Sequence, residues 1–204
     1  DYVHKFKILG GEGFMYPYLI EYMDYIGSNY RDKIGSFRLG SNGTILPKKE
    51  VLESCRRNNV MVDISDYTCT IGYKSKLDEV SRICVDNGIA VDVKRTGEQW
   101  LDMGFPNNKP GKKDEEQLRN HFSKCAMFCR NFSDGKLFFC CSNFAATKAG
   151  LFPKNENDYF DFRKDFTKQE LLEYELGYSY LGHTTFCAVC RGCSDEVNPF
   201  HVEV

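Results

Sequence analysis

Seven of the ten cysteines in this 204-residue chain lie in its last 80 residues. They form two groups: Cys125, Cys129, Cys140 and Cys141, and then Cys187, Cys190 and Cys193. The second group has the spacing C-x2-C-x2-C, in which two intervening residues let the chain turn so that the sulfurs converge on a metal. This spacing predicts a metal site built from thiolates.

A structural zinc ion and an iron–sulfur cluster each take four ligands, so not all seven cysteines are needed. Cys187 and Cys190 are the best pair. Cys140 is favoured over Cys141, because neighbouring residues of an expected strand point to opposite faces. The fourth place is left open among Cys125, Cys129 and Cys193. Thiolate spacing alone does not separate zinc from iron.

The remaining composition favours a cytoplasmic protein in which clustered thiols bind metal rather than form disulfides. The net charge is −2, and the basic runs are short, so no nucleic-acid partner is expected. No apolar run reaches the roughly 20 residues of a membrane helix, so no membrane partner is expected either. Cys55 and Cys84 fall on the apolar faces of expected helices and are assigned to the core. Cys69 lies in a loop and receives no role.

Residues 1–95 consist of strands that alternate with helices. Strands are expected at 5–9, 34–39, 60–65 and 89–94, and helices at 17–27, 47–59 and 75–87. This alternation predicts an α/β fold with a parallel sheet, in which ligands bind at the carboxyl ends of the strands. The loops at those ends offer seven candidate residues for binding a cofactor: Gly10, Gly11, Glu12, Asn42, Ser65, Asp66 and Arg95.

The alternation stops after residue 95, and residues 96–113 have the composition of a connecting loop. The domain boundary is placed near residue 110, which gives domains 1–110 and 111–204. In the second domain, the dipeptide Asp134-Gly135 predicts the turn of a β-hairpin. Helices are expected at 114–122 and at 167–176, and a capping box begins the second of them.

Three segments at the ends of the expected strands resemble those of radical S-adenosylmethionine (SAM) enzymes. The run ILGGEGFMYPYLIEYMDYIG resembles the family's glycine–glycine–glutamate segment, RLGSNGTILP its threonine–asparagine–glycine segment, and VMVDISDYT its ribose-contacting segment. The resemblance implies that Glu12 holds the amino group of SAM and that Ser65 and Asp66 face its ribose. Asn42 would help to line the pocket, and Lys94 or Arg95 would contact a carboxylate.

Residues 125–193 resemble the SPASM or twitch appendage of this family. Cys125, Gly135 and Cys140 match the first part of its pattern, and Cys187 and Cys190 match its closing C-x2-C. The resemblance implies an auxiliary [4Fe–4S] cluster, and it favours iron–sulfur over zinc. It also implies a 5′-deoxyadenosyl radical that modifies a peptide, protein or sugar, and an electron donor such as flavodoxin or ferredoxin.

The sequence departs from the family at two places. Gly13 stands where the family usually has proline, and no cysteine precedes Cys55, so the C-x3-C-x2-C motif of the SAM-cleaving cluster is absent. The expected fold is therefore an incomplete (β/α) TIM-like barrel that lacks its first unit, followed by a small cysteine-rich domain. The expected function is that of a radical SAM oxidoreductase whose intact form carries the missing loop, so this chain alone is expected to be inactive. The alternative is a non-catalytic binding module stapled by zinc or iron–sulfur.

Overall fold

The computed structural model describes residues 2–68, 72, 74–95, 99–107, 111–126, 130–177 and 181–203. The chain divides into two compact units, one formed by residues 1–98 with 203–204 and the other by residues 99–202. Each unit has its own architecture and is described by itself. Among the helices of the described ranges, none combines the length and the apolar character that a membrane crossing requires.

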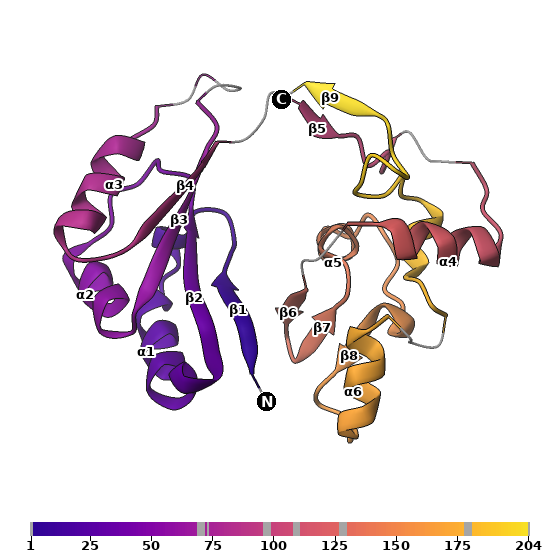
Figure 1. Ribbon diagram of the computed structural model, residues 1–204, viewed down its shortest axis with the longest axis horizontal. Helices are drawn as coiled ribbons and strands as arrows, with labels where there is room; N and C mark the ends of the chain where they lie inside the picture. Colours follow the sequence, from indigo (N-terminus) through magenta and orange to yellow (C-terminus); the bar gives the residue numbers. More distant parts are fainter. Residues whose placement is uncertain are drawn as a thin grey trace. The chain divides into compact units, whose positions relative to one another are not determined.

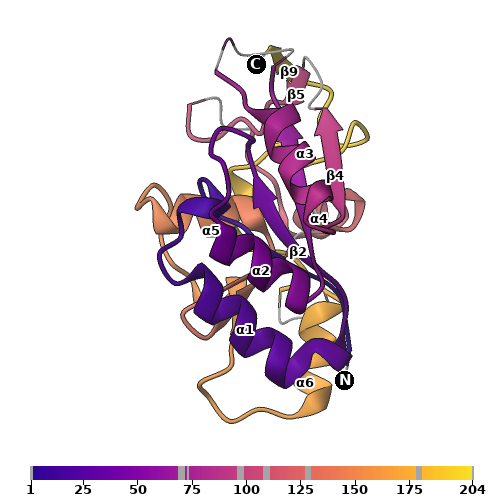
Figure 2. The same ribbon diagram turned by 90° about the vertical axis from the view of Figure 1, so that its left-hand side faces the viewer.

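Four parallel strands form the sheet of the N-terminal unit. They follow one another in the order β1 (Val3–Ile8), β2 (Ile34–Ser41), β3 (Val60–Asp66) and β4 (Val91–Arg95). The connections contain α1 (Leu19–Tyr30), α2 (Lys49–Arg57) and α3 (Leu77–Asp86), with short 3-10 turns at Gly13–Met15 and Arg31–Lys33. All three α-helices cover the same face of the sheet (Figure 1, Figure 2). The predicted α/β class with a parallel sheet is confirmed.

The helix-covered face of the sheet supplies the core of this unit. Phe37 and Leu39 of β2 and Val62 and Ile64 of β3 are at most 1% exposed. They belong to one apolar cluster that also includes Met23 of α1. Full burial of a side chain of this size contributes about 1.5–3 kcal/mol, so this layer accounts for much of the unit's stability.

The opposite face of the sheet carries charged side chains. Lys7 Nζ lies 2.9 Å from Asp63 Oδ2, and Arg38 Nη1 lies 2.7 Å from Asp63 Oδ1 and 3.0 Å from Asp92 Oδ2. Burial acts to raise the pKa of Asp63, but hydrogen bonds from Lys7 and Arg38 outweigh it and leave the pKa lowered. Both faces of a parallel sheet are usually apolar, so this ionic ladder distinguishes the second face.

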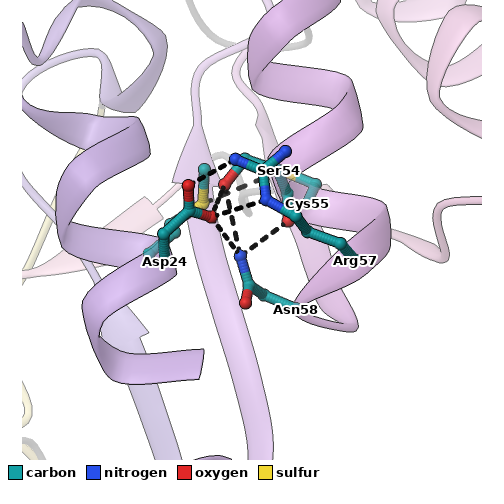
Figure 3. Close-up of polar contacts among 6 residues, drawn as sticks. Asp24, Ser54, Cys55, Arg57 and Asn58 are labelled. Atoms are coloured by element: carbon teal, nitrogen blue, oxygen red, sulfur yellow. Dashed lines mark hydrogen bonds and ion pairs between the residues drawn. The ribbon is translucent and has the colours of Figure 1, made fainter. Parts of the chain in front are cut away.

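A polar cluster joins α1 to α2 (Figure 3). Asp24 accepts hydrogen bonds from Ser54 Oγ at 2.7 Å and from Asn58 Nδ2 at 2.6 Å, and it pairs with Arg57. A Cβ atom added at Gly27 would lie 1.9 Å from Asn58 Oδ1. The expected helix end at Gly27 is therefore wrong: α1 continues to Tyr30, and the glycine makes room for Asn58.

The C-terminal unit contains two small sheets and three α-helices among its described residues. The sheets pair β5 (Gln99–Leu101) with β9 (His201–Glu203), and β6 (Asn131–Ser133) with β7 (Lys136–Phe138) and β8 (Tyr159–Asp161). The helices are α4 (Glu115–Lys124), α5 (Cys141–Lys148) and α6 (Lys168–Glu175), and 3-10 turns occur at Glu156–Asp158 and Thr185–Ala188. The predicted hairpin is confirmed, since Asp134 and Gly135 adopt φ values of 51° and 69° at its turn. The capping box of α6 is also confirmed.

The described part of the expected 96–113 loop packs into the C-terminal unit. Asp102 N donates to Phe200 O at 2.8 Å, Asn198 Nδ2 donates to Asp102 O at 3.0 Å, and Arg191 N donates to Met103 O at 3.0 Å. These contacts tie the segment to the chain's last residues. The units accordingly divide between residues 98 and 99, whereas the composition placed the boundary near residue 110.

Candidate functional site

Four cysteines from separate parts of the C-terminal unit line one small cavity. They are Cys125, Cys140, Cys187 and Cys190, and the cavity has a volume of about 30 Å³. Space for a single water begins at roughly 10–15 Å³ on the same measure, so the cavity is larger than one water requires. Aromatic and aliphatic side chains complete its wall.

Local structure brings each of these cysteines to the cavity. Cys125 is the C-cap of α4, whose start is fixed by a capping box. Cys140 leaves the hairpin and becomes the N-cap of α5. Cys187 lies within the 3-10 turn Thr185–Ala188, and Cys190 follows two residues after that turn. Three segments that are distant in sequence therefore converge on one volume.

A hydrogen-bond donor approaches each of these sulfurs. Cys193 N donates to Cys125 Sγ at 3.3 Å, and Gly192 N donates to Cys190 Sγ at 3.2 Å. Backbone N–H groups at the start of α5 donate to Cys140. The hydroxyl of Thr184 lies 3.3 Å from Cys187 Sγ. Hydrogen bonds of this kind stabilise the charged form of a thiol.

Burial opposes the charge on three of these thiols, those of Cys140, Cys187 and Cys190. Desolvation raises the pKa of Cys140 to about 11 and that of Cys190 to about 12, and it also raises the pKa of Cys187. These groups are therefore thiols at neutral pH unless a cation joins them. A coordinated metal deprotonates its thiol ligands, so the site is suited to metal-dependent ionisation.

Two basic side chains, Lys113 and His121, lie at or next to the cavity. Lys113 Nζ donates to Cys187 O at 2.9 Å and to Cys190 O at 2.8 Å. His121 lines the cavity, and burial, followed by the nearby Lys113, lowers its pKa to about 4. The imidazole of His121 is consequently neutral at physiological pH.

The remaining cysteines have other positions. Cys141 begins α5, and Cys193 contributes its backbone N–H; the side chains of both are absent from the cavity lining. Cys55 and Cys84 are 1% and 0% exposed in the core of the N-terminal unit, as predicted. Cys69 and Cys129 lie outside the described residues.

Across the described residues, no three His, Cys, Asp or Glu side chains are close enough to hold a single metal ion. A mononuclear zinc site requires its sulfurs at about 2.3 Å from one point. The four cavity cysteines instead surround a volume.

The other candidate site lies at the carboxyl ends of β1 and β2. Glu12 Oε1 accepts a hydrogen bond from Phe14 N at 3.2 Å, and Oε2 accepts one from Asn42 N at 2.8 Å. The carboxylate thus links the loops after the two strands. A Cβ atom at Gly13 would lie 2.3 Å from Gly40 O, so this buried position accepts only glycine. Gly10 and Gly11 precede this link and leave the backbone open.

The ends of β3 and β4 bring three more predicted residues to the same edge of the sheet. Asp66 is directly opposite Arg95 in the register, and Ser65 precedes it. Asp66 Oδ1 accepts hydrogen bonds from Thr68 N at 2.9 Å and Thr68 Oγ1 at 2.6 Å, and these bonds lower its pKa. Arg95 Nε lies 3.6 Å from Asp66 Oδ2. The structure therefore gathers the predicted residues at one edge, where N–H and hydroxyl groups of the strand-end loops already donate to the carboxylates of Glu12 and Asp66.

No protein-family model and no curated protein matches the sequence. Sequence patterns did not indicate three residues of the cysteine site: Lys113, Thr184 and Gly192. Lys113 contacts residues more than 70 positions away, so only the folded chain reveals its role. Thr184 and Gly192 are close to Cys187 and Cys190 in the sequence, and that proximity is the one signal that could have indicated them.

Proposed function

We propose that this chain is part of a radical SAM enzyme and that its C-terminal unit holds an auxiliary [4Fe–4S] cluster. One observation carries the proposal: Cys125, Cys140, Cys187 and Cys190 surround one cavity. These are the same four cysteines that match the SPASM pattern by their spacing. Hydrogen-bonding groups approach all four sulfurs, and such groups would stabilise the charge of thiolate ligands.

The geometry of the donors favours iron–sulfur over zinc in this proposal. A zinc ion would draw the sulfurs toward one point, and no described group of side chains is gathered that closely. A cluster of iron and sulfide occupies volume and sets its thiolate ligands farther apart. The four cysteines line one cavity, and such a group would occupy the space between them.

In the same proposal, the N-terminal unit is the incomplete (β/α) barrel of the enzyme. Glu12 would bind the amino group of SAM, Ser65 and Asp66 would face its ribose, and Arg95 would contact its carboxylate. The three helices cover one face of the sheet, so the ionic ladder of Lys7, Arg38, Asp63 and Asp92 on the other face would line the interior of such a barrel. SAM would supply the radical chemistry, and the protein would position the substrate and exclude water.

The intact enzyme would act in the cytoplasm on a peptide, protein or sugar and would receive electrons from a flavodoxin- or ferredoxin-type donor. The SAM-cleaving cluster needs a C-x3-C-x2-C motif that this chain does not contain. The second candidate is a metal-stapled binding module without turnover. This candidate is favoured by the carboxylates of Glu12 and Asp66, because backbone N–H groups of the strand-end loops already donate hydrogen bonds to both.

The proposal is tested by anaerobic reconstitution with iron and sulfide, followed by metal analysis and visible absorption. We expect about four iron and four sulfide per chain and a brown colour. Cys140→Ser should lose most of the iron, whereas Cys141→Ser, the adjacent matched control, should retain it. A colourless protein with stoichiometric zinc, or equal iron loss in both variants, would exclude the proposed cluster.

Calorimetry of SAM binding to the reconstituted protein tests the N-terminal half of the proposal. Glu12→Gln should bind SAM at least about tenfold more weakly, because it removes a charged hydrogen bond worth roughly 1.5–3 kcal/mol. Glu21→Gln on the exposed surface of α1 is the matched control and should bind like the wild type. If the wild type shows no binding, the second candidate function is the better one.

A further inference from the structure

Lys113 makes a long-range contact with the loop that carries two of the cavity cysteines. Its ammonium donates to the backbone oxygen of Cys187 at 2.9 Å and to that of Cys190 at 2.8 Å. Both distances are normal for strong hydrogen bonds. One side chain thus joins both ends of the C-x2-C loop and fixes the separation of the two residues.

The charge of Lys113 lacks a counterion among the described side chains. Lys113 is half-buried, and its contacts are the two carbonyl oxygens, with no described carboxylate at ion-pair distance. Partial burial of a cation without an anion is costly. A cluster held by four thiolates carries net negative charge, and in the adjacent cavity it would supply the missing anion.

We propose that Lys113 is a positioning residue of the auxiliary cluster that also raises the cluster's reduction potential. This inference rests on the proposed function. On reduction, one electron passes from a flavodoxin- or ferredoxin-type donor to the cluster, the donor is oxidised by one electron, and no bond is broken. The cluster becomes more negative by one charge, so a fixed ammonium beside it stabilises the reduced state.

The experiment compares Lys113→Met, Lys113→Arg and Lys112→Met in the reconstituted protein. Methionine keeps an unbranched apolar stem without the charge, and arginine keeps the charge. Lys112 is the exposed neighbour, so its methionine variant changes the net charge equally. The measurements are iron content, the rate of iron release to a chelator, and the reduction potential by spectroelectrochemical titration.

Lys113→Met should have a more negative potential than the wild type. It should also release iron roughly tenfold faster, in the range expected for loss of an outer partner of a metal ligand. Lys112→Met should match the wild type in both measurements, and Lys113→Arg should keep a potential near that of the wild type. A purely structural role would change iron retention without shifting the potential of the loaded fraction.

An unchanged potential in a loaded Lys113→Met protein overturns the inference and leaves the cluster assignment standing. If circular dichroism shows that Lys113→Met is folded but it takes up no iron, the Lys113→Arg variant decides whether the charge at this position has the proposed role. A loaded arginine variant with near wild-type potential supports the role of the charge, and an iron-free one overturns it. A wild-type chain that takes up neither iron nor sulfide refutes the proposed function itself, which is a different result.

Discussion

Substitution of Gly27 by alanine tests how tightly α1 packs against α2. The alanine Cβ would lie 1.9 Å from Asn58 Oδ1 and 2.5 Å from Asn58 Cγ, far inside normal contact distance. Asn58 cannot move without cost, because its amide donates to Asp24 Oδ1 at 2.6 Å and to Ser54 O at 3.0 Å (Figure 3). Gly27→Ala should therefore displace the asparagine side chain.

The expected magnitude combines three effects. Overpacking costs about 1–3 kcal/mol. Displacing Asn58 breaks its hydrogen bond with the carboxylate of Asp24, which costs roughly 1.5 kcal/mol or more. Replacing glycine by alanine inside a helix returns about 1 kcal/mol. We expect Gly27→Ala to lower the free energy of unfolding of the N-terminal unit by about 2 kcal/mol.

The sign of the effect should reverse when Asn58 is truncated. In an Asn58→Gly background the Oδ1, Cγ and Cβ atoms that the added Cβ would approach within 3.0 Å are all absent, so Gly27→Ala should stabilise the protein by up to about 1 kcal/mol through helix propensity alone. Urea unfolding followed by circular dichroism measures this cycle. Fluorescence of Trp100, the chain's single tryptophan, reports on the C-terminal unit and should not change. A Gly27→Ala cost that is the same in both backgrounds would refute the packing argument.

Two further predictions concern the cysteine loop and the α1–α2 cluster. Gly192 has φ +94°, and a Cβ there would lie 2.4 Å from Val197 Cγ2, so Gly192→Ala should lower the free energy of unfolding by about 2 kcal/mol and reduce the amount of bound iron. Gly150 has φ +71° and open space around it, so the control variant Gly150→Ala should retain its iron. Equal iron content in the two variants would contradict this reasoning. The hydrogen bond from Arg57 lowers the pKa of Asp24 below its usual value of 3.8. The stability that this carboxylate confers is therefore present above that pH and is lost as the pH falls further. Asp24→Asn should flatten the acid side of the urea-stability profile between about pH 5 and pH 2, whereas Asp32→Asn, an exposed control, should follow the wild type.

Elements with a local sequence signal could be predicted well. The apolar stripe of α2, formed by Val51, Leu52 and Cys55, is buried as expected. The turn at Asp134-Gly135 needed only two residues that tolerate positive φ. The prediction at Gly27 was wrong, because a glycine that ends a helix and one that makes room for a neighbour look alike in sequence.

Elements that depend on distant partners could not be predicted. β5 and β9 are three-residue strands about 100 positions apart, and neither is long enough to show a strand pattern. α5 lacks a clear apolar stripe, so the sequence predicts Cys140 as the end of a strand, whereas it is the N-cap of that helix. Its preference over Cys141 agrees with the cavity lining, although the strand geometry that motivated it does not apply.

The convergence of the cysteines is more informative than their number. Free cysteine behaves as a small apolar residue, so burial alone would not distinguish Cys140 or Cys190 from Cys55 and Cys84 in the N-terminal core. The two environments differ in their polar partners. Cys55 contacts Met23 Sδ, another weakly polar sulfur, whereas the cavity sulfurs are approached by backbone N–H groups or a hydroxyl. Hydrogen bonds of this kind stabilise a charged sulfur, and the proposed cluster would require its four ligands to be charged.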